Sequence, residues 1–347
     1  MDVINEELKD LDVQQVEQNF QCSKDYSWNI LVYTPIFIVA LILYPINPFL
    51  SALFSFFTAV GILLELKGYE ALSTFLPKKE CSNSLYLYNP KPKGALPIIL
   101  LTAQKEHLEP YYNLTSGKRF KKKIKMILAT AFIFTGIIFI GAIRSSAFNS
   151  VEVIFFWLAL PVLLLMVISL VSILLSYRFN KITRYSSGYE TLAATEIFSE
   201  LVSSGKVTNV QLCFLAREGD NGNEQGIDEF LQTSPEIELA INLQSLMGQK
   251  LEVVTEEGIT NTEKAYKPLI LEGYNVYRIL FSKELPTTNY NGVTAGYKLF
   301  KNAIPTITVT GKEIDSFKSN SLDEQSLENY KSFVKKLVEN LNNFYSD

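Results

Sequence analysis

The chain of 347 residues contains one histidine, His107, and this limits the metal chemistry that it can support. A histidine surrounded by carboxylates can hold a divalent metal ion, because imidazole nitrogen and carboxylate oxygen are both common ligands. The acidic residues that could join it, if the fold gathers them, are Glu106, Glu109, Glu218, Asp220 and Asp315. The plainer alternative is that His107 is a surface or hydrogen-bonded residue beside the end of a strand.

Other motifs with a known chemistry are not evident in the sequence. The loop 218–224 is rich in Asp, Asn and Gly, but it misses the ligand spacing of an EF-hand and indicates a solvated turn. There is no Gly-x-Ser-x-Gly nucleophile motif and no glycine-rich phosphate loop. The net charge of -4 argues against a nucleic-acid partner.

Strand-like and helix-like patterns alternate along the soluble parts of the chain. Apolar or alternating runs predict strands at 83–89, 96–103, 207–215, 240–246, 251–255 and 304–310. Helical periodicity predicts helices at 189–204 and 323–344, and a short N-terminal helix with Leu8, Leu11, Val16 and Phe20 on one face. This order predicts an α/β fold with helices on both faces of the sheet.

Five short motifs follow one another at the ends of these predicted elements. They are Thr-Ala-Gln at 102–104, Arg-Tyr-Ser-Ser-Gly at 184–188, Ala-Arg-Glu at 216–218, Asn-Leu-Gln-Ser-Leu-Met-Gly at 242–248 and Ala-Ile-Pro at 303–305. Their order resembles the di-zinc aminopeptidases of peptidase family twenty-eight, the aminopeptidase Y-like group, in its membrane-inserted form. The resemblance covers roughly residue 68 to the C-terminus without the inserted hairpin. It implies an aminopeptidase-like mixed sheet flanked by helices.

The same resemblance implies that the zinc site is degenerate. Carried over position by position, the metal-site residues of the family fall on Gln104, Arg184, Arg217, Glu218 and Gln244. Arg184 stands at the bridging aspartate and Arg217 at the general-base glutamate, and only Glu218 keeps a ligand type. The late histidine of the family falls near Asp315. Because a cation repels zinc and one histidine cannot replace two, we expect no metal and no catalytic residues, with His107 as the residual ligand of the alternative.

Two apolar hairpins interrupt the chain. No charged residue occurs in 26–64, in 126–143 or in 153–177, and Pro45 and Pro48 divide the first of these runs. About 20 apolar residues per helix span a bilayer. The sequence therefore predicts four transmembrane helices in the lipid bilayer, two of them inserted within the α/β domain.

Positive charge predicts the orientation of these helices. Lysines gather at Lys121–Lys125, and Arg178, Lys181 and Arg184 follow the fourth helix, whereas the opposite loops offer only Arg144. Since Lys and Arg favour the cytoplasmic side, the soluble domain and both termini are expected there. The three cysteines, Cys22, Cys81 and Cys213, are far apart and are expected to be free thiols in that reducing compartment.

These patterns divide the chain into five segments. Residues 1–25 form a cytoplasmic N-terminal segment, 26–66 the first hairpin, 67–122 the first part of the peptidase-like domain, 123–177 the second hairpin and 178–347 the remainder of that domain. The predicted function is a catalytically degenerate binding or assembly module for a protein or peptide partner. One alternative is a membrane-bound metallopeptidase whose altered zinc site uses His107 and Glu218; another is a structural role of the helices alone.

The two arginines at former metal positions offer a ligand chemistry. Ligands of open α/β sheets bind beyond the carboxyl ends of the strands. Arg184 and Arg217 would make that cleft electropositive and suited to a carboxylate. The competing hypothesis is that both arginines pair with Glu218 and nearby acids, which would close the cleft.

Overall fold

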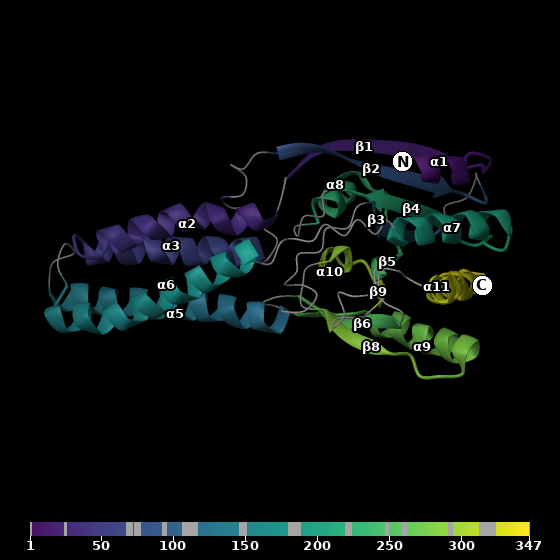
Figure 1. The fold of residues 1–347 in the computed structure, drawn as a ribbon. Helices are drawn as coiled ribbons and strands as arrows, with labels where there is room; N and C mark the ends of the chain where they lie inside the picture. The colour runs from purple at the N-terminus through teal and green to yellow at the C-terminus, as the bar shows by residue number, and fades with distance from the viewer. Residues whose placement is uncertain are drawn as a thin grey trace. The chain divides into compact units, whose positions relative to one another are not determined.

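The chain forms two compact units in the computed structural model (Figure 1). One unit consists of Met1–Cys22, Lys78–Glu109 and Arg184–Asp347, and the other of Ser23–Pro77 and Pro110–Thr183. The structure describes residues 2–23, 26–66, 72, 78–91, 96–105, 117–145, 151–179, 189–218, 224–246, 250–258, 262–290, 294–311 and 324–346.

The first unit is built on a mixed sheet of nine strands within the described residues. These strands are β1 (Gln14–Ser23), β2 (Lys78–Tyr88), β3 (Ile98–Gln104), β4 (Gln211–Arg217), β5 (Leu239–Leu246), β6 (Leu251–Glu257), β7 (Glu263–Lys264), β8 (Thr287–Tyr290) and β9 (Thr306–Gly311). Their order is β1-β2-β4-β3-β5-β9-β6-β7, and β8 pairs with β6. The four central strands β4, β3, β5 and β9 run parallel, while β2 and β6 flank them antiparallel.

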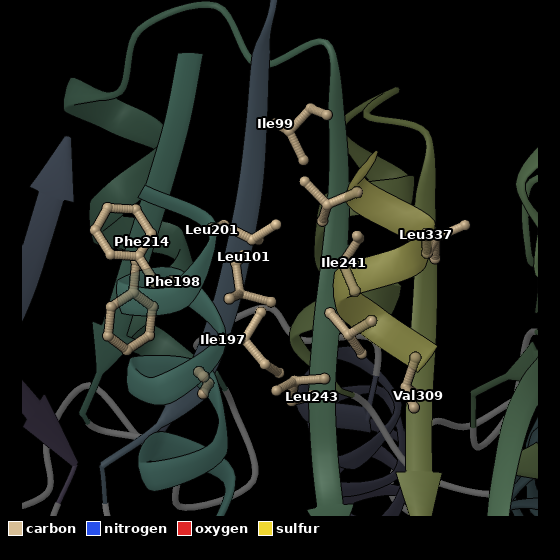
Figure 2. Close-up of a cluster of buried hydrophobic side chains, with 14 of the residues drawn as sticks. Ile99, Leu101, Ile197, Phe198, Leu201, Phe214, Ile241, Leu243, Val309 and Leu337 are labelled. Carbon is tan, nitrogen blue, oxygen red and sulfur yellow. The ribbon is translucent and has the colours of Figure 1, made fainter. Parts of the chain in front are cut away.

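Helices cover both faces of this sheet. They are α1 (Asp2–Leu8), α7 (Tyr189–Ser203), α8 (Gln225–Thr233), α9 (Lys267–Phe281), α10 (Ala295–Lys301) and α11 (Glu324–Phe344). The main apolar core joins α1, α7, α9 and α11 to one face, and α8 and α10 cover the other. Figure 2 shows Ile197, Phe198 and Leu201 of α7 beside the strand residues Leu101 and Phe214. All seven residues of β3 are buried, which explains its nearly continuous apolar run.

The second unit is a bundle of α2 (Tyr26–Leu43), α3 (Pro48–Leu66), α5 (Gly117–Arg144) and α6 (Val153–Phe179). Small and polar side chains lie inside it, among them Ser51, whose hydroxyl donates to the Ala40 carbonyl at 2.6 Å. Large apolar side chains such as Phe57 and Trp157 are exposed. By length and apolar composition, one stretch of described residues, Lys125–Arg144, is able to cross a membrane; Pro48–Leu64 and Val153–Ser169 are shorter apolar stretches.

The sheet agrees with the strands predicted from the sequence, and the other elements agree in part. The six predicted strands form, as do the predicted helices that are observed as α7 and α11. The four predicted apolar regions are helical. Among the described residues, however, only α5 contains an apolar stretch long enough to cross a membrane, and the apolar stretches of α3 and α6 are shorter. The predicted N-terminal helix is wrong beyond Leu8, because Val16 and Phe20 belong to β1, where strand pairing replaces helical hydrogen bonds.

The expectation of three free thiols is also wrong. Cys22 at the end of β1 and Cys81 in β2 form a disulfide, with their Cα atoms 6.0 Å apart. The sequence did not indicate this pair, because the two cysteines have a sequence separation of 59 and the whole first hairpin lies between them. Cys213 in β4 is free and buried.

Candidate functional site at the carboxyl ends of the strands

Along one face of the sheet, the side chains of the parallel strands change from apolar to polar toward the carboxyl ends. On the face that α8 and α10 cover, β3 presents Ile98 and Leu100 first and then Thr102 and Gln104. The neighbouring strands repeat this change, with polar residues Arg217 in β4, Asn242 and Gln244 in β5, and Thr308 and Thr310 in β9. Because the four strands are parallel, their carboxyl ends lie at one edge of the sheet, and the polar side chains gather there.

Arg217 is the centre of this polar group. Its side chain is fully buried, with 0% exposure. The guanidinium donates to Thr102 Oγ1 at 2.8 Å, to Asn242 Oδ1 at 3.2 Å and to Gln244 Oε1 at 3.2 Å. A planar guanidinium has five donors in a fixed fork, so it can bind acceptors on several strands at once. Arg217 therefore ties the ends of β3, β4 and β5 together.

Glu224 balances the charge of this arginine. Its Oε2 accepts from Arg217 Nε at 3.4 Å, and the carboxylate side chain is 4% exposed. Glu224 directly precedes α8 and has a left-handed backbone with φ of 50°. Gly226, two residues later, lies so close to β4 that a Cβ would collide with the Glu218 carbonyl. The start of α8 is thus packed tightly enough to hold Glu224 against Arg217.

A second buried carboxylate, Glu257 at the end of β6, continues the network. Glu257 accepts hydrogen bonds from the hydroxyls of Thr294 and Thr308 and from the backbone of Tyr297. Thr308 in turn accepts from Asn242 Nδ2 at 3.4 Å, which joins Glu257 to the acceptors of Arg217. Burial raises the pKa of Glu257 above its ordinary value, although the hydrogen bonds and Arg217 oppose this.

We call this set the Arg217 network. Its members come from the parallel strands, from the end of β6 and from the residues before α8 and α10, and hydrogen bonds of their side chains link them: Thr102, Arg217, Glu224, Asn242, Gln244, Glu257, Thr294 and Thr308. Every one of these side chains is buried. Such a satisfied polar network rigidifies the region around it, because each buried group has a partner that water would otherwise supply.

The structure describes four of the residues that the sequence analysis assigned to the former metal site: Gln104, Arg217, Glu218 and Gln244. Gln104 ends β3 opposite Arg217 in the ladder, and Gln244 binds Arg217 directly. Glu218, the residue that keeps a ligand type, faces away: its Oε2 accepts from the Ser82 backbone N–H at 2.6 Å. Arg184, His107, Asp220 and Asp315 lie outside the described residues.

The two hypotheses for the arginines are decided for Arg217. It pairs with a nearby acid and is buried, so it offers no exposed charge to a ligand. The acid is Glu224 rather than Glu218, because the Glu218 side chain is engaged with β2. The expectation that Arg217 makes an electropositive cleft is therefore wrong.

The donor set does not fit zinc. Among the described residues, Arg217 is surrounded by amide and hydroxyl oxygens and by one carboxylate, Glu224, which the guanidinium already binds, whereas zinc prefers several imidazole, thiolate and carboxylate ligands. Among the residues that the structure describes, no group of three or more His, Cys, Asp or Glu side chains could hold a metal ion. The cationic Arg217 also disfavours a second cation by charge repulsion.

Sequence reasoning missed Thr102, Asn242, Glu224 and Glu257. A signal existed for the first two, since Thr102 with Gln104 and Asn242 with Gln244 are polar pairs spaced by two within otherwise apolar strands. Period-two spacing places both members of a pair on one face. Glu224 and Glu257 carry no such signal, because their burial depends on how α8 and β6 pack.

Comparisons with known proteins add a distant structural likeness. No family model and no curated protein matches the chain. Solved structures that match include a zinc aminopeptidase from Bacillus subtilis (TM-score 0.44, 11% identity, 77% of this chain and 51% of that chain). Another is a zinc-dependent exopeptidase from Parabacteroides distasonis, with a TM-score of 0.49, 10% identity, and coverage of 98% of this chain and 88% of that chain. A third is a glutaminyl cyclase from Fimbriiglobus ruber, with a TM-score of 0.47, 9% identity, and coverage of 97% of this chain and 85% of that chain.

This chain spans about half the length of the Bacillus subtilis aminopeptidase. At such identities and TM-scores these likenesses establish neither a family nor an activity for this chain.

Proposed function

We propose that this chain is a membrane-anchored, aminopeptidase-like domain in which a buried arginine has replaced the metal centre, and that it acts as a binding or assembly module. The observation that carries the proposal is the position of Arg217. Its guanidinium comes from a strand end that the sequence resemblance assigns to the zinc site. It binds Gln244, another of the assigned positions, and also Thr102 and Asn242.

A fixed organic cation can take over the structural part of a metal's role. A zinc ion holds the ends of several strands together through its ligands, and the guanidinium does the same through hydrogen bonds from β4 to β3 and β5. It cannot take over the chemical part, because an arginine neither binds a water molecule as a Lewis acid nor lowers its pKa. The fold is thereby kept while the hydrolytic chemistry is lost.

The helical unit supports membrane anchoring. Its outward side chains are large and apolar, as at Phe57, Ile140, Trp157 and Leu165, whereas Ser51, Ala52 and Ala59 are buried. Small and polar residues at helix contacts with apolar residues outside are typical of helices packed in lipid. We propose that all four apolar helices lie in the bilayer, and that the lysines at 121–125 hold the soluble unit and both termini in the cytoplasm.

A partner of such a module would contact the loops beyond the strand ends. Arg217 offers no charge to such a partner, since its side chain is fully buried. Because the Arg217 network fixes the strand ends, the loops that leave them start from rigid positions, and rigid positions favour binding over mobile ones. The partner class that fits is a protein or a peptide.

Hydrolysis assays on the full-length protein in detergent test the loss of catalysis. Wild type and Glu218→Ala are incubated with zinc and aminoacyl substrates of several side-chain classes. We expect both to hydrolyse at the uncatalysed rate, because the cation at Arg217 excludes the metal chemistry. Turnover by wild type that Glu218→Ala abolishes would establish the altered metallopeptidase instead. Alkaline extraction of membranes tests the anchor: the protein should stay in the pellet.

A further inference from the structure

The disulfide between Cys22 and Cys81 occupies a special place in the chain. Cys22 is the last residue of the first segment of the sheet unit, and Cys81 lies near the start of its next segment, which begins at Lys78. The bond therefore joins two segments of the sheet unit between which the chain forms the first apolar hairpin. Both cysteines are buried, Cys22 at 0% and Cys81 at 3% exposure.

The bond also secures the outer strand of the sheet. β1 lies at one end of the strand order and pairs with β2 alone. Edge strands have half of the hydrogen bonds of central strands and open at lower free energy. A covalent link at the end of β1 prevents this opening where the chain leaves the sheet.

Ser82, the neighbour of Cys81, forms hydrogen bonds with two residues that follow strand ends. The Ser82 N–H donates to Glu218 Oε2 at 2.6 Å, and the Ser82 carbonyl accepts from Lys105 Nζ at 2.8 Å. Glu218 follows Arg217 directly and Lys105 follows Gln104 directly. Cys81 is therefore one residue away from hydrogen bonds to the residues that follow β3 and β4.

We propose that Cys22 and Cys81 form a reversible, redox-responsive bond that fastens the end of β1 to β2. The inference rests on the cytoplasmic orientation proposed above. In a reducing compartment, disulfides that do form are transient and sense oxidants, whereas in an oxidising compartment the same bond would be permanent.

The chemistry is a thiol–disulfide exchange with a small-molecule disulfide as oxidant. When the end of β1 opens, one cysteine thiolate attacks the oxidant and releases a thiol, leaving a mixed disulfide on the protein. The second cysteine then attacks the protein sulfur of that mixed disulfide and releases a second thiol. Two protein thiols and one disulfide thus become one protein disulfide and two small thiols, and two electrons pass to the oxidant.

The bond state is measured in intact cells that contain the full-length protein with Cys213→Ser. Cys213 is dispensable for this purpose, because it is buried and burial raises the pKa of its thiol. Cells are quenched in acid before and after treatment with dipyridyl disulfide, and the peptide pair that contains Cys22 and Cys81 is quantified by mass spectrometry. Cys22→Ser in the same background is the matched control and yields no linked pair.

We expect mostly free thiols before treatment and mostly linked peptides after it. Linked peptides in nearly all molecules before treatment, or none after it, would overturn the inference. A compartment reporter fused after Asp347 distinguishes a failure of this redox inference from a failure of the proposed cytoplasmic orientation. A cytoplasmic reporter with no linked peptides rejects this inference alone, and an external reporter with permanent linkage also rejects the proposed orientation.

Hydrogen exchange of the purified full-length protein in detergent tests the fastening role. Backbone amides of β1 should exchange at least about tenfold faster after reduction than before it, because the edge strand then opens freely. Amides of β5, in the centre of the sheet, serve as the internal reference. Equal exchange of β1 in both states would overturn the fastening role.

Discussion

Replacement of Arg217 by methionine is the most informative perturbation of this protein. Methionine keeps most of the length of the side chain but removes the charge and all of its donors. The Glu224 carboxylate then remains buried without its cationic partner, and removing one partner of a buried ion pair costs about 3–5 kcal/mol. Thr102, Asn242 and Gln244 also lose a donor. We expect a loss of about 4 kcal/mol, a large part of the total stability of about 5–15 kcal/mol.

A double-mutant cycle isolates the ion pair. Glu224→Gln removes the charge of the partner, so Arg217→Met combined with Glu224→Gln should be more stable than Arg217→Met alone by about 2 kcal/mol. Arg217→Lys keeps the charge but loses the fork, and its stability should fall between wild type and Arg217→Met. Stability is read from hydrogen exchange of β3 and β4 in the full-length protein in detergent, since the most protected amides report global unfolding.

Two results would refute the reasoning. A loss below about 1 kcal/mol for Arg217→Met would mean that the guanidinium does not organise the strand ends. Equal stability of the single and the double variant would mean that Glu224 is not left as an unpaired charge.

Three further predictions concern packing, pH and topology. Gly226→Ala should lower stability by about 1–3 kcal/mol because its Cβ collides with a backbone carbonyl, whereas Gly136→Ala, with no atom within 4 Å, should be well tolerated; exchange rates that rank the two the other way would contradict this. Burial raises the pKa of the Glu257 carboxyl above its ordinary value of 4.5, so the folded protein binds the carboxyl proton more tightly than the unfolded chain does. This contribution to stability is fully present below pH 4.5 and is lost as the pH rises through the raised pKa. Glu257→Gln should therefore gain stability relative to wild type as pH rises from about 4.5 to about 8, with Glu256→Gln as control for the substitution; a constant difference would refute the assignment. A reporter that is active only outside the cytoplasm should be silent when fused after Asp347, and activity there would reverse the proposed orientation.

The sheet could be predicted from the sequence because its strands are buried on both faces. A run such as Ile-Ile-Leu-Leu-Thr-Ala in β3 is nearly continuous, and buried parallel strands require this pattern. The N-terminal strand β1 was missed for the opposite reason. It lies at the edge of the sheet with mostly exposed side chains, so no apolar periodicity marks it, and only its pairing with β2 defines it.

The candidate site could be predicted only in part. Gln104, Arg217 and Gln244 were placed together by the order of short motifs, and parallel strands do bring them to one edge. The sequence did not indicate the direction of individual side chains. Glu218 points toward β2, and the acid that pairs with Arg217 comes from Glu224, seven residues along the chain, because the tight start of α8 brings it back to β4.

Zinc content of the purified full-length protein tests the central claim most directly. The protein is saturated with zinc, freed of loosely held metal by dialysis and analysed by elemental mass spectrometry beside Glu218→Ala. On the proposal that Arg217, whose guanidinium binds three oxygens, has replaced the metal centre, we predict well under one zinc ion per chain in both proteins. Two tightly held zinc ions in wild type, lost in Glu218→Ala, would contradict the account.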